Sequence, residues 1–124
     1  MTPGDDKSGF TKLELDLMQV IWRRGASTVS EVQEALEQEL AYTTVQTMLN
    51  ILERKKKLTR ELRGRAFVYS ASVTEQRATG NALRDLIDRM FGGSSEELVM
   101  SLVKTRQIKP KQLAKLMRKL EEED

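Results

Sequence analysis

The sequence predicts a mainly α-helical protein that contains one small β-hairpin. Three observations lead to this fold class. Apolar residues recur at helical spacing through most of the chain, two β-prone segments flank Gly64, and a Phe-Gly-Gly break at 91–93 separates two further helical segments. We therefore expect three helices and a hairpin first, followed by a second helical region.

The first helix begins with a capping box. Thr11 and Glu14 have the S/T-x-x-E spacing in which each side chain satisfies a free backbone N–H at a helix start. Apolar residues then follow at helical spacing through Trp22. Arg23 favours the negative end of the helix, and Gly25 is typical of a left-handed stop.

A second capping box, formed by Thr28 and Glu31, predicts the start of the second helix. We expect this helix to continue through Leu40, because its apolar residues repeat at helical steps. These residues are Val32, Ala35, Leu36 and Leu40.

The third helix is expected over residues 43–56, and its two faces differ in kind. At roughly 100° per residue, one face is apolar and the opposite face carries hydroxyl and amide groups with one arginine and no acid. The apolar face consists of Val45, Met48, Leu49 and Leu52, and the polar face of Thr43, Gln46, Thr47, Asn50 and Arg54. Amide and hydroxyl side chains are suited to contact base edges in a DNA major groove.

A basic hairpin follows the third helix. Residues 58–63 and 66–70 are β-prone, and Arg63, Gly64 and Arg65 form the turn. Residues 40–72 hold seven Lys or Arg and two Asp or Glu, a net charge of +5 within a chain whose net charge is +2. Such a basic middle segment suits a polyanionic partner.

Three helices followed by a hairpin with a basic tip form a winged helix-turn-helix. In that arrangement the third helix enters the major groove and the wing lies against the DNA backbone or minor groove. We expect Thr43, Thr44, Gln46, Thr47 and Asn50 to contact bases, and Arg54, Lys55, Arg63 and Arg65 to contact phosphates. The alternatives are a protein–protein adaptor with the same fold, and arginines that only keep a strand edge soluble.

The remaining sequence predicts helices over about 74–90 and 95–103 and a last helix that starts near Pro110. Their apolar stripes could form a core within one chain, but three short helices make a thin core, which favours a core shared between two chains. The expected dimer interface comprises Leu83, Leu86, Ile87, Met90, Leu98, Leu102, Leu113, Leu116, Met117 and Leu120.

Composition excludes several classes of function. The chain has no cysteine and no histidine, which argues against disulfides, Cys/His metal sites and His-based catalysis. No G-x-S-x-G or P-loop motif is present, so we expect neither an enzyme nor a bound cofactor. The polar N-terminus and the lack of a long apolar stretch predict a cytoplasmic protein without membrane insertion.

Five segments of the chain together form a distinctive pattern: residues 13–22 (LELDLMQVIW), 42–56 (YTTVQTMLNILERKK), 63–69 (RGRAFVY), 91–93 (FGG) and 97–102 (ELVMSL). In these segments the chain resembles the BlaI/MecI/CopY penicillinase-repressor family. It implies a homodimer that binds a palindromic operator and blocks transcription. The copper-responsive branch carries a Cys-rich C-terminal motif, which this sequence lacks.

In antibiotic-responsive members, the resemblance further implies inactivation by cleavage in the C-terminal region, through a sensor-linked protease. By position, the matching bond falls near Ser101–Leu102, within the helix that contains Leu98 to Val103. We therefore expect a disordered tail at 1–9, a DNA-binding domain at 10–72 and a helical dimerisation domain at 73–124.

Overall fold

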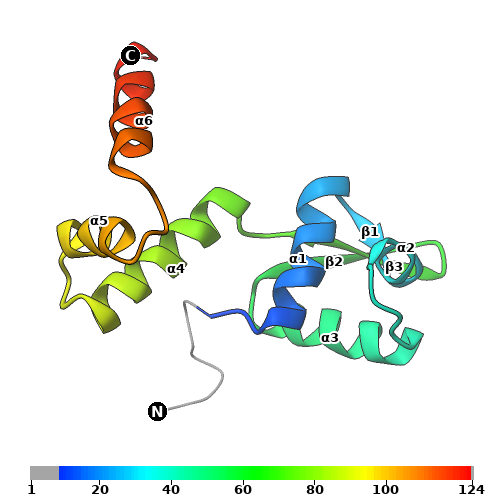
Figure 1. Ribbon diagram of the computed structural model, residues 1–124. Helices are drawn as coiled ribbons and strands as arrows, with labels where there is room; N and C mark the ends of the chain where they lie inside the picture. The colour runs from blue at the N-terminus through cyan, green and yellow to red at the C-terminus, as the bar shows by residue number, and fades with distance from the viewer. Residues whose placement is uncertain (1–8, 124) are drawn as a thin grey trace. The chain divides into compact units, whose positions relative to one another are not determined.

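The computed structural model describes residues 9–123 as six helices and three short strands (Figure 1). The disordered tail expected at 1–9 lies outside the described residues, apart from Gly9. The chain divides into two compact units, an N-terminal unit (Met1–Ala82) and a C-terminal unit (Leu83–Asp124), and the division falls inside a helix. The fold is mainly helical with one small hairpin, which confirms the predicted fold class.

Helix α1 (Lys12–Arg24) has the predicted ends. The Thr11 hydroxyl accepts the Glu14 N–H at 3.1 Å, and Glu14 Oε1 accepts the Thr11 N–H at 2.8 Å. At the other end Gly25 has a φ of 88°, which a residue with a Cβ rarely adopts. The capping box at one end and the glycine at the other therefore set the length of α1.

Helix α2 (Val29–Ala35) is shorter than the sequence predicts. Its capping box forms at Thr28 and Glu31 as expected, but the backbone turns extended at Leu36, so the prediction that this helix continues through Leu40 is wrong. The Gln33 side chain donates to the Leu40 carbonyl at 2.9 Å and holds the extended segment against the helix. Leu36 and Leu40 still pack against the core, so the apolar spacing is satisfied without a helix.

Helix α3 (Tyr42–Arg54) ends two residues before its predicted end. Lys56 has a φ of 65° and turns the chain into strand β2 (Leu58–Arg63). Strand β3 (Ala66–Ala71) returns antiparallel to β2, from the pair Arg63 and Ala66 to the pair Leu58 and Ala71.

A third strand, β1 (Ser27–Thr28), extends this hairpin into a sheet of order β1-β3-β2. Ser27 pairs with Tyr69 and Thr28 with Val68, both antiparallel. Strand β1 was not predicted, because a two-residue strand is too short to show the alternation of apolar and polar residues.

The core of the N-terminal unit collects one face of each helix and the base of the sheet. Its fully or nearly fully buried apolar side chains are Leu17, Met18, Ile21, Val29, Val32, Val45, Leu49, Leu52, Leu58 and Tyr69. Helix α3 packs against α2, α1 and β2, so its apolar face is fixed from three sides.

Helix α4 (Glu75–Met90) begins in the N-terminal unit and ends in the C-terminal unit, which also holds α5 (Ser95–Lys104) and α6 (Pro110–Glu122). The predicted break between α4 and α5 is present, with positive φ at both Gly92 and Gly93. None of α4, α5 and α6 contains a buried residue. Within residues 9–123, no helix has the combination of length and apolarity that crossing a bilayer requires.

Candidate nucleic-acid interface

The two faces of α3 lie as the sequence predicts. Val45, Leu49 and Leu52 are fully buried. On the other face the four residues Thr43, Gln46, Thr47 and Arg54 are exposed, and Asn50 is half-buried. Thr44 is also exposed, in the first turn of the helix. The helix thus presents a row of amide and hydroxyl groups on a support that cannot rotate without exposing its core face.

The N-terminus of α3 carries no side-chain cap, because its N-cap residue is Ala41. The first turn also lacks an acidic residue, in contrast to α1 and α2, which carry Glu14 and Glu31 there. Free N–H groups and the positive end of a helix dipole favour an approaching anion.

Two side chains of the sheet donate hydrogen bonds to the same atom of Asn50. Its Oδ1 accepts the hydroxyl of Tyr69 at 2.6 Å and Nη1 of Arg60 at 3.2 Å. Tyr69 is only 1% exposed, so this bond satisfies a hydroxyl that is otherwise shut off from water. Asn50 therefore joins the polar face of α3 to the hairpin formed by β2 and β3.

Arg60 is itself held in place by the wing. Its guanidinium lies over the ring of Phe67, 4.3 Å from the ring centre, in cation–π geometry. It also lines a hollow of about 370 Å³ between α3 and β2, together with Thr47, Asn50, Glu53 and Arg54.

Arg60, Tyr69 and Glu53 were not predicted at this surface. A signal for Arg60 was present, because a two-residue turn at Gly64 and Arg65 sets the register of the two strands and so pairs Arg60 with Tyr69 on one face of the hairpin. Glu53 brings a carboxylate to the edge of a face that was expected to be free of acids.

The tip of the wing has the predicted residues in a two-residue turn. Gly64 adopts a φ of 64°, as the turn between paired strands requires. Arg63 and Arg65 are both exposed, and Arg63 lies 3.8 Å from the Glu61 carboxylate. An exposed pair at that distance contributes little, so both guanidinium groups can reach an anion.

Lys55 was expected to contact a DNA phosphate, but its side chain forms an ion pair within the protein. Its Nζ is 2.9 Å from Oε2 of Glu14, a carboxylate that is 3% exposed at the start of α1. Burial alone would raise the pKa of Glu14. The hydrogen bonds from Lys55 and the Thr11 N–H, with the charge of Lys55, outweigh that effect and hold the pKa below its usual value of 4.5. Lys55 thus ties the end of α3 to the start of α1.

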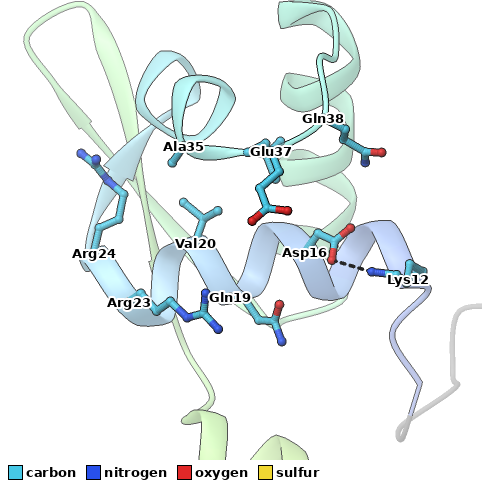
Figure 2. Close-up of a pocket in the computed structure, with 10 residues that line it drawn as sticks. Lys12, Asp16, Gln19, Val20, Arg23, Arg24, Ala35, Glu37 and Gln38 are labelled. Atoms are coloured by element: carbon cyan, nitrogen blue, oxygen red, sulfur yellow. Dashed lines mark hydrogen bonds and ion pairs between the residues drawn. The ribbon is translucent and has the colours of Figure 1, made fainter.

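A second hollow lies between α1 and the segment that follows α2 (Figure 2). Its volume is about 520 Å³, and Figure 2 shows the Lys12–Asp16 ion pair on one wall and Glu37 and Gln38 on the other. Its charges are mixed, with Arg23 and Arg24 at one end, so it lacks the uniform sign of a polyanion site.

Comparison with known proteins places the chain in a family. A sequence model described as the penicillinase repressor matches residues 10–122. The chain belongs to the penicillinase repressor family. A penicillinase repressor from Bacillus licheniformis is 28% identical over 111 residues, which cover 88% of this chain and 87% of that protein.

Two solved structures resemble the chain. The monomeric form of BlaI from Bacillus licheniformis, solved in complex with the blaP half-operator, is 32% identical over 56% of this chain and 87% of its own, with a TM-score of 0.49. The YusO protein from Bacillus subtilis is 19% identical over 84% of this chain and 77% of its own, with a TM-score of 0.53. The likeness to YusO concerns the fold alone.

In this penicillinase repressor family member, the residues expected at a dimer interface are largely uncovered. Ile87, Leu98 and Leu113 are half-buried. The other seven are exposed by between 37% and 69%, and these are Leu83, Leu86, Met90, Leu102, Leu116, Met117 and Leu120.

The bond Ser101–Leu102, expected as a cleavage position, lies within helix α5. The Ser101 carbonyl accepts both the N–H and the hydroxyl of Thr105, at 2.9 and 2.6 Å. The Leu102 carbonyl accepts the N–H groups of Gln107 and Ile108. Both carbonyls beside this bond are therefore engaged in the helix and in the turn that follows it.

Proposed function

We propose that the chain is a homodimeric transcriptional repressor that binds a palindromic operator. One observation carries the proposal: the acid-poor row of amide and hydroxyl groups on α3 stands exposed next to an arginine-tipped hairpin. Membership of the penicillinase repressor family supports it, as does the half-operator complex of the BlaI relative. In this proposal Thr43, Thr44, Gln46, Thr47 and Asn50 contact bases.

The phosphate contacts in this proposal come from Arg54, Lys55, Arg63 and Arg65. The wing arginines have the exposure that such contacts need, and the uncapped N-terminus of α3 adds to the positive field. Lys55 can contribute only if its ion pair with Glu14 opens, so we expect it to be the weakest of the four.

The wing is tested by changing Arg65 to Ala in full-length protein. Binding to all duplexes should weaken, and the slope of log affinity against log salt should become shallower by about one unit. Arg23→Ala is the matched control, because it removes the same charge from an exposed position on α1. If Arg65→Ala and Arg23→Ala behave alike, the wing is not a DNA contact.

The base contacts are tested by selecting duplexes from a random pool and comparing the selected sequence with random DNA. A repressor should prefer the selected half-sites, which we expect to be spaced by about one helical turn or a multiple of it. Equal affinity for all duplexes in dilute buffer, or no binding, would instead favour a winged-helix adaptor for another protein.

Residues 10–72 would bind DNA, and residues 73–124 would form the dimer. The exposed apolar residues of α4, α5 and α6 support this division, since a second copy could cover them. A protein with this role acts on DNA in the cytoplasm and performs no catalysis.

We further propose that a protease linked to a sensor of β-lactam or cell-envelope stress cleaves the chain between Ser101 and Leu102. The cleaved repressor then dissociates from its operator. A protease needs an extended substrate, so α5 must unwind around this bond first. A chain ending at Ser101 should lose dimerisation and bind a full operator at least about a hundredfold more weakly, because the two half-sites are then bound independently. Unchanged operator affinity of that truncated chain would contradict this route.

A further inference from the structure

Asn50 contributes an amide to the α3 surface, and an amide can in principle offer either its oxygen or its nitrogen to a base. An asparagine that uses both atoms pairs with adenine, because Oδ1 accepts the N6 amino group while Nδ2 donates to N7. Which atoms are available depends on what holds the side chain from within the protein.

Two observations decide which atom faces the protein. Arg60 has only N–H donors and no acceptor, so the amide atom 3.2 Å from its Nη1 must be the oxygen. The Tyr69 hydroxyl donates to the same oxygen at 2.6 Å. A carbonyl oxygen has two lone pairs, and these two donors take both.

The position of the Arg60 guanidinium does not depend on its hydrogen bond to Asn50 alone. The stacking of its guanidinium on Phe67 at 4.3 Å holds it on the wing. The strand register supports this position, since Arg60 pairs with Tyr69 and so projects from the same face of the sheet. Asn50 is therefore oriented before DNA arrives.

We propose that Arg60 and Tyr69 turn Asn50 into a donor-only group, so that the base pair it contacts is G·C. This inference rests on the proposed function. With Oδ1 engaged by these two donors, the NH₂ group is left for the DNA. Its two N–H bonds suit the adjacent acceptors N7 and O6 of guanine, whereas thymine offers the single acceptor O4. Adenine offers N7 but sets its N6 donor against the amide, and the oxygen that would accept it is occupied. Arg60 and Tyr69 are positioning residues in this proposal.

The first test uses full-length protein and duplexes selected from a random pool. Asn50→Ala identifies the base pair at which preference is lost. We expect that pair to be G·C. Replacing the whole pair by A·T, with adenine in the place of guanine, should weaken binding of the unchanged protein by about tenfold. Inosine keeps N7 and O6 and should bind as well as guanine. An A·T pair at this position, or no position that responds to Asn50→Ala, overturns the inference.

The second test asks whether Arg60 sets the preference. In Arg60→Met the donor-only partner is gone, and the Tyr69 hydroxyl can accept as well as donate, so the amide can rotate and present its oxygen to adenine. The affinity ratio of guanine to adenine duplexes should fall about tenfold. Arg60→Lys restores a donor-only partner and should restore the ratio.

Arg65→Met is the matched control. It removes the same charge from the wing without touching Asn50, so it should weaken binding to both duplexes and leave their ratio unchanged. A ratio that falls equally in Arg65→Met and Arg60→Met overturns the role of Arg60. Failure of the unchanged protein to bind any duplex is a different result, because it removes the proposed function itself.

Discussion

The two units of the chain use similar apolar patterns but bury them differently. Helix α1 and helix α6 both carry apolar residues at helical spacing. In α1 three of these, Leu17, Met18 and Ile21, are fully or nearly fully buried, whereas α6 has no buried residue. The comparison teaches that amphipathic spacing predicts which face of a helix must be covered, but not whether the same chain covers it.

The largest expected effect concerns the core of the N-terminal unit. Leu49→Ala should lower the free energy of unfolding by about 2–5 kcal/mol, because it leaves a cavity beneath α3. Leu120, which is 59% exposed, is the matched position in α6. At concentrations where the chain is monomeric, Leu120→Ala should cost less than about 0.5 kcal/mol. Urea unfolding followed by circular dichroism, which reports the helices of both units, measures both variants, and similar losses would remove the contrast.

The second prediction concerns the C-terminal unit in the proposed dimer. Leu116→Gln should raise the dimer dissociation constant by about a hundredfold, a loss of roughly 2.7 kcal/mol at an apolar interface. Lys115→Gln is the control, since its position lies about 200° from the apolar stripe of α6. Sedimentation equilibrium measures the constant, and equal effects of the two changes would place the interface elsewhere.

The third prediction tests the ion pair that ties α1 to α3. Lys55→Met leaves the buried Glu14 carboxylate without its cation and should cost about 1–3 kcal/mol of unfolding free energy at pH 7.

The pH dependence of that pair follows from the lowered pKa of Glu14. The folded state favours the ionised form, so the stabilisation is present above about pH 4.5 and is lost as the pH falls through the lower folded pKa. Glu14→Gln should flatten this acid loss in urea titrations between pH 7 and 3. Glu31 keeps part of the dependence, since its pKa is also lowered, by the Thr28 N–H. A variant as acid-sensitive as the unchanged protein would contradict this role for Glu14.

The smallest expected effect again compares the units. Lys56 and Arg106 both adopt left-handed backbone, with φ of 65° and 62°. Lys56→Gly relieves that conformation in the N-terminal unit and should raise the free energy of unfolding by about 1 kcal/mol. Arg106→Gly should leave the main urea transition unchanged, because the core that melts there lies in residues 17–69. A loss of stability in Lys56→Gly would show that the lysine side chain contributes more than its backbone costs.

Much of the fold could be predicted because its signals are local. The capping boxes at Thr11 and Thr28 set two helix starts, and the turn at Gly64 set the ends of β2 and β3 to within one residue. The family and its repressor class are confirmed as well. These features depend on residues three or four apart, or on one turn.

The errors arose at contacts that the spacing of residues three or four apart does not encode. The end of α2 depends on Gln33 reaching the Leu40 carbonyl, and β1 exists only because β3 offers it a partner. Lys55 belongs to a basic run in the sequence, yet its side chain forms an ion pair with Glu14, forty-one positions away. For Arg60, helical periodicity could identify the polar face of α3 but not the strand residue that reaches it.

The two-residue strand β1 restricts the motion of the wing at its base. Thr28 pairs with Val68 and also caps α2, so any swing at the base of the hairpin would pull that cap apart. From Val68 to the tip of the hairpin, only the residue pairs Leu62–Phe67 and Arg63–Ala66 follow, and β1 does not extend alongside them. The arm that can flex is therefore short, and the wing arginines can adjust to the curvature of a duplex only over the span of these last two residue pairs.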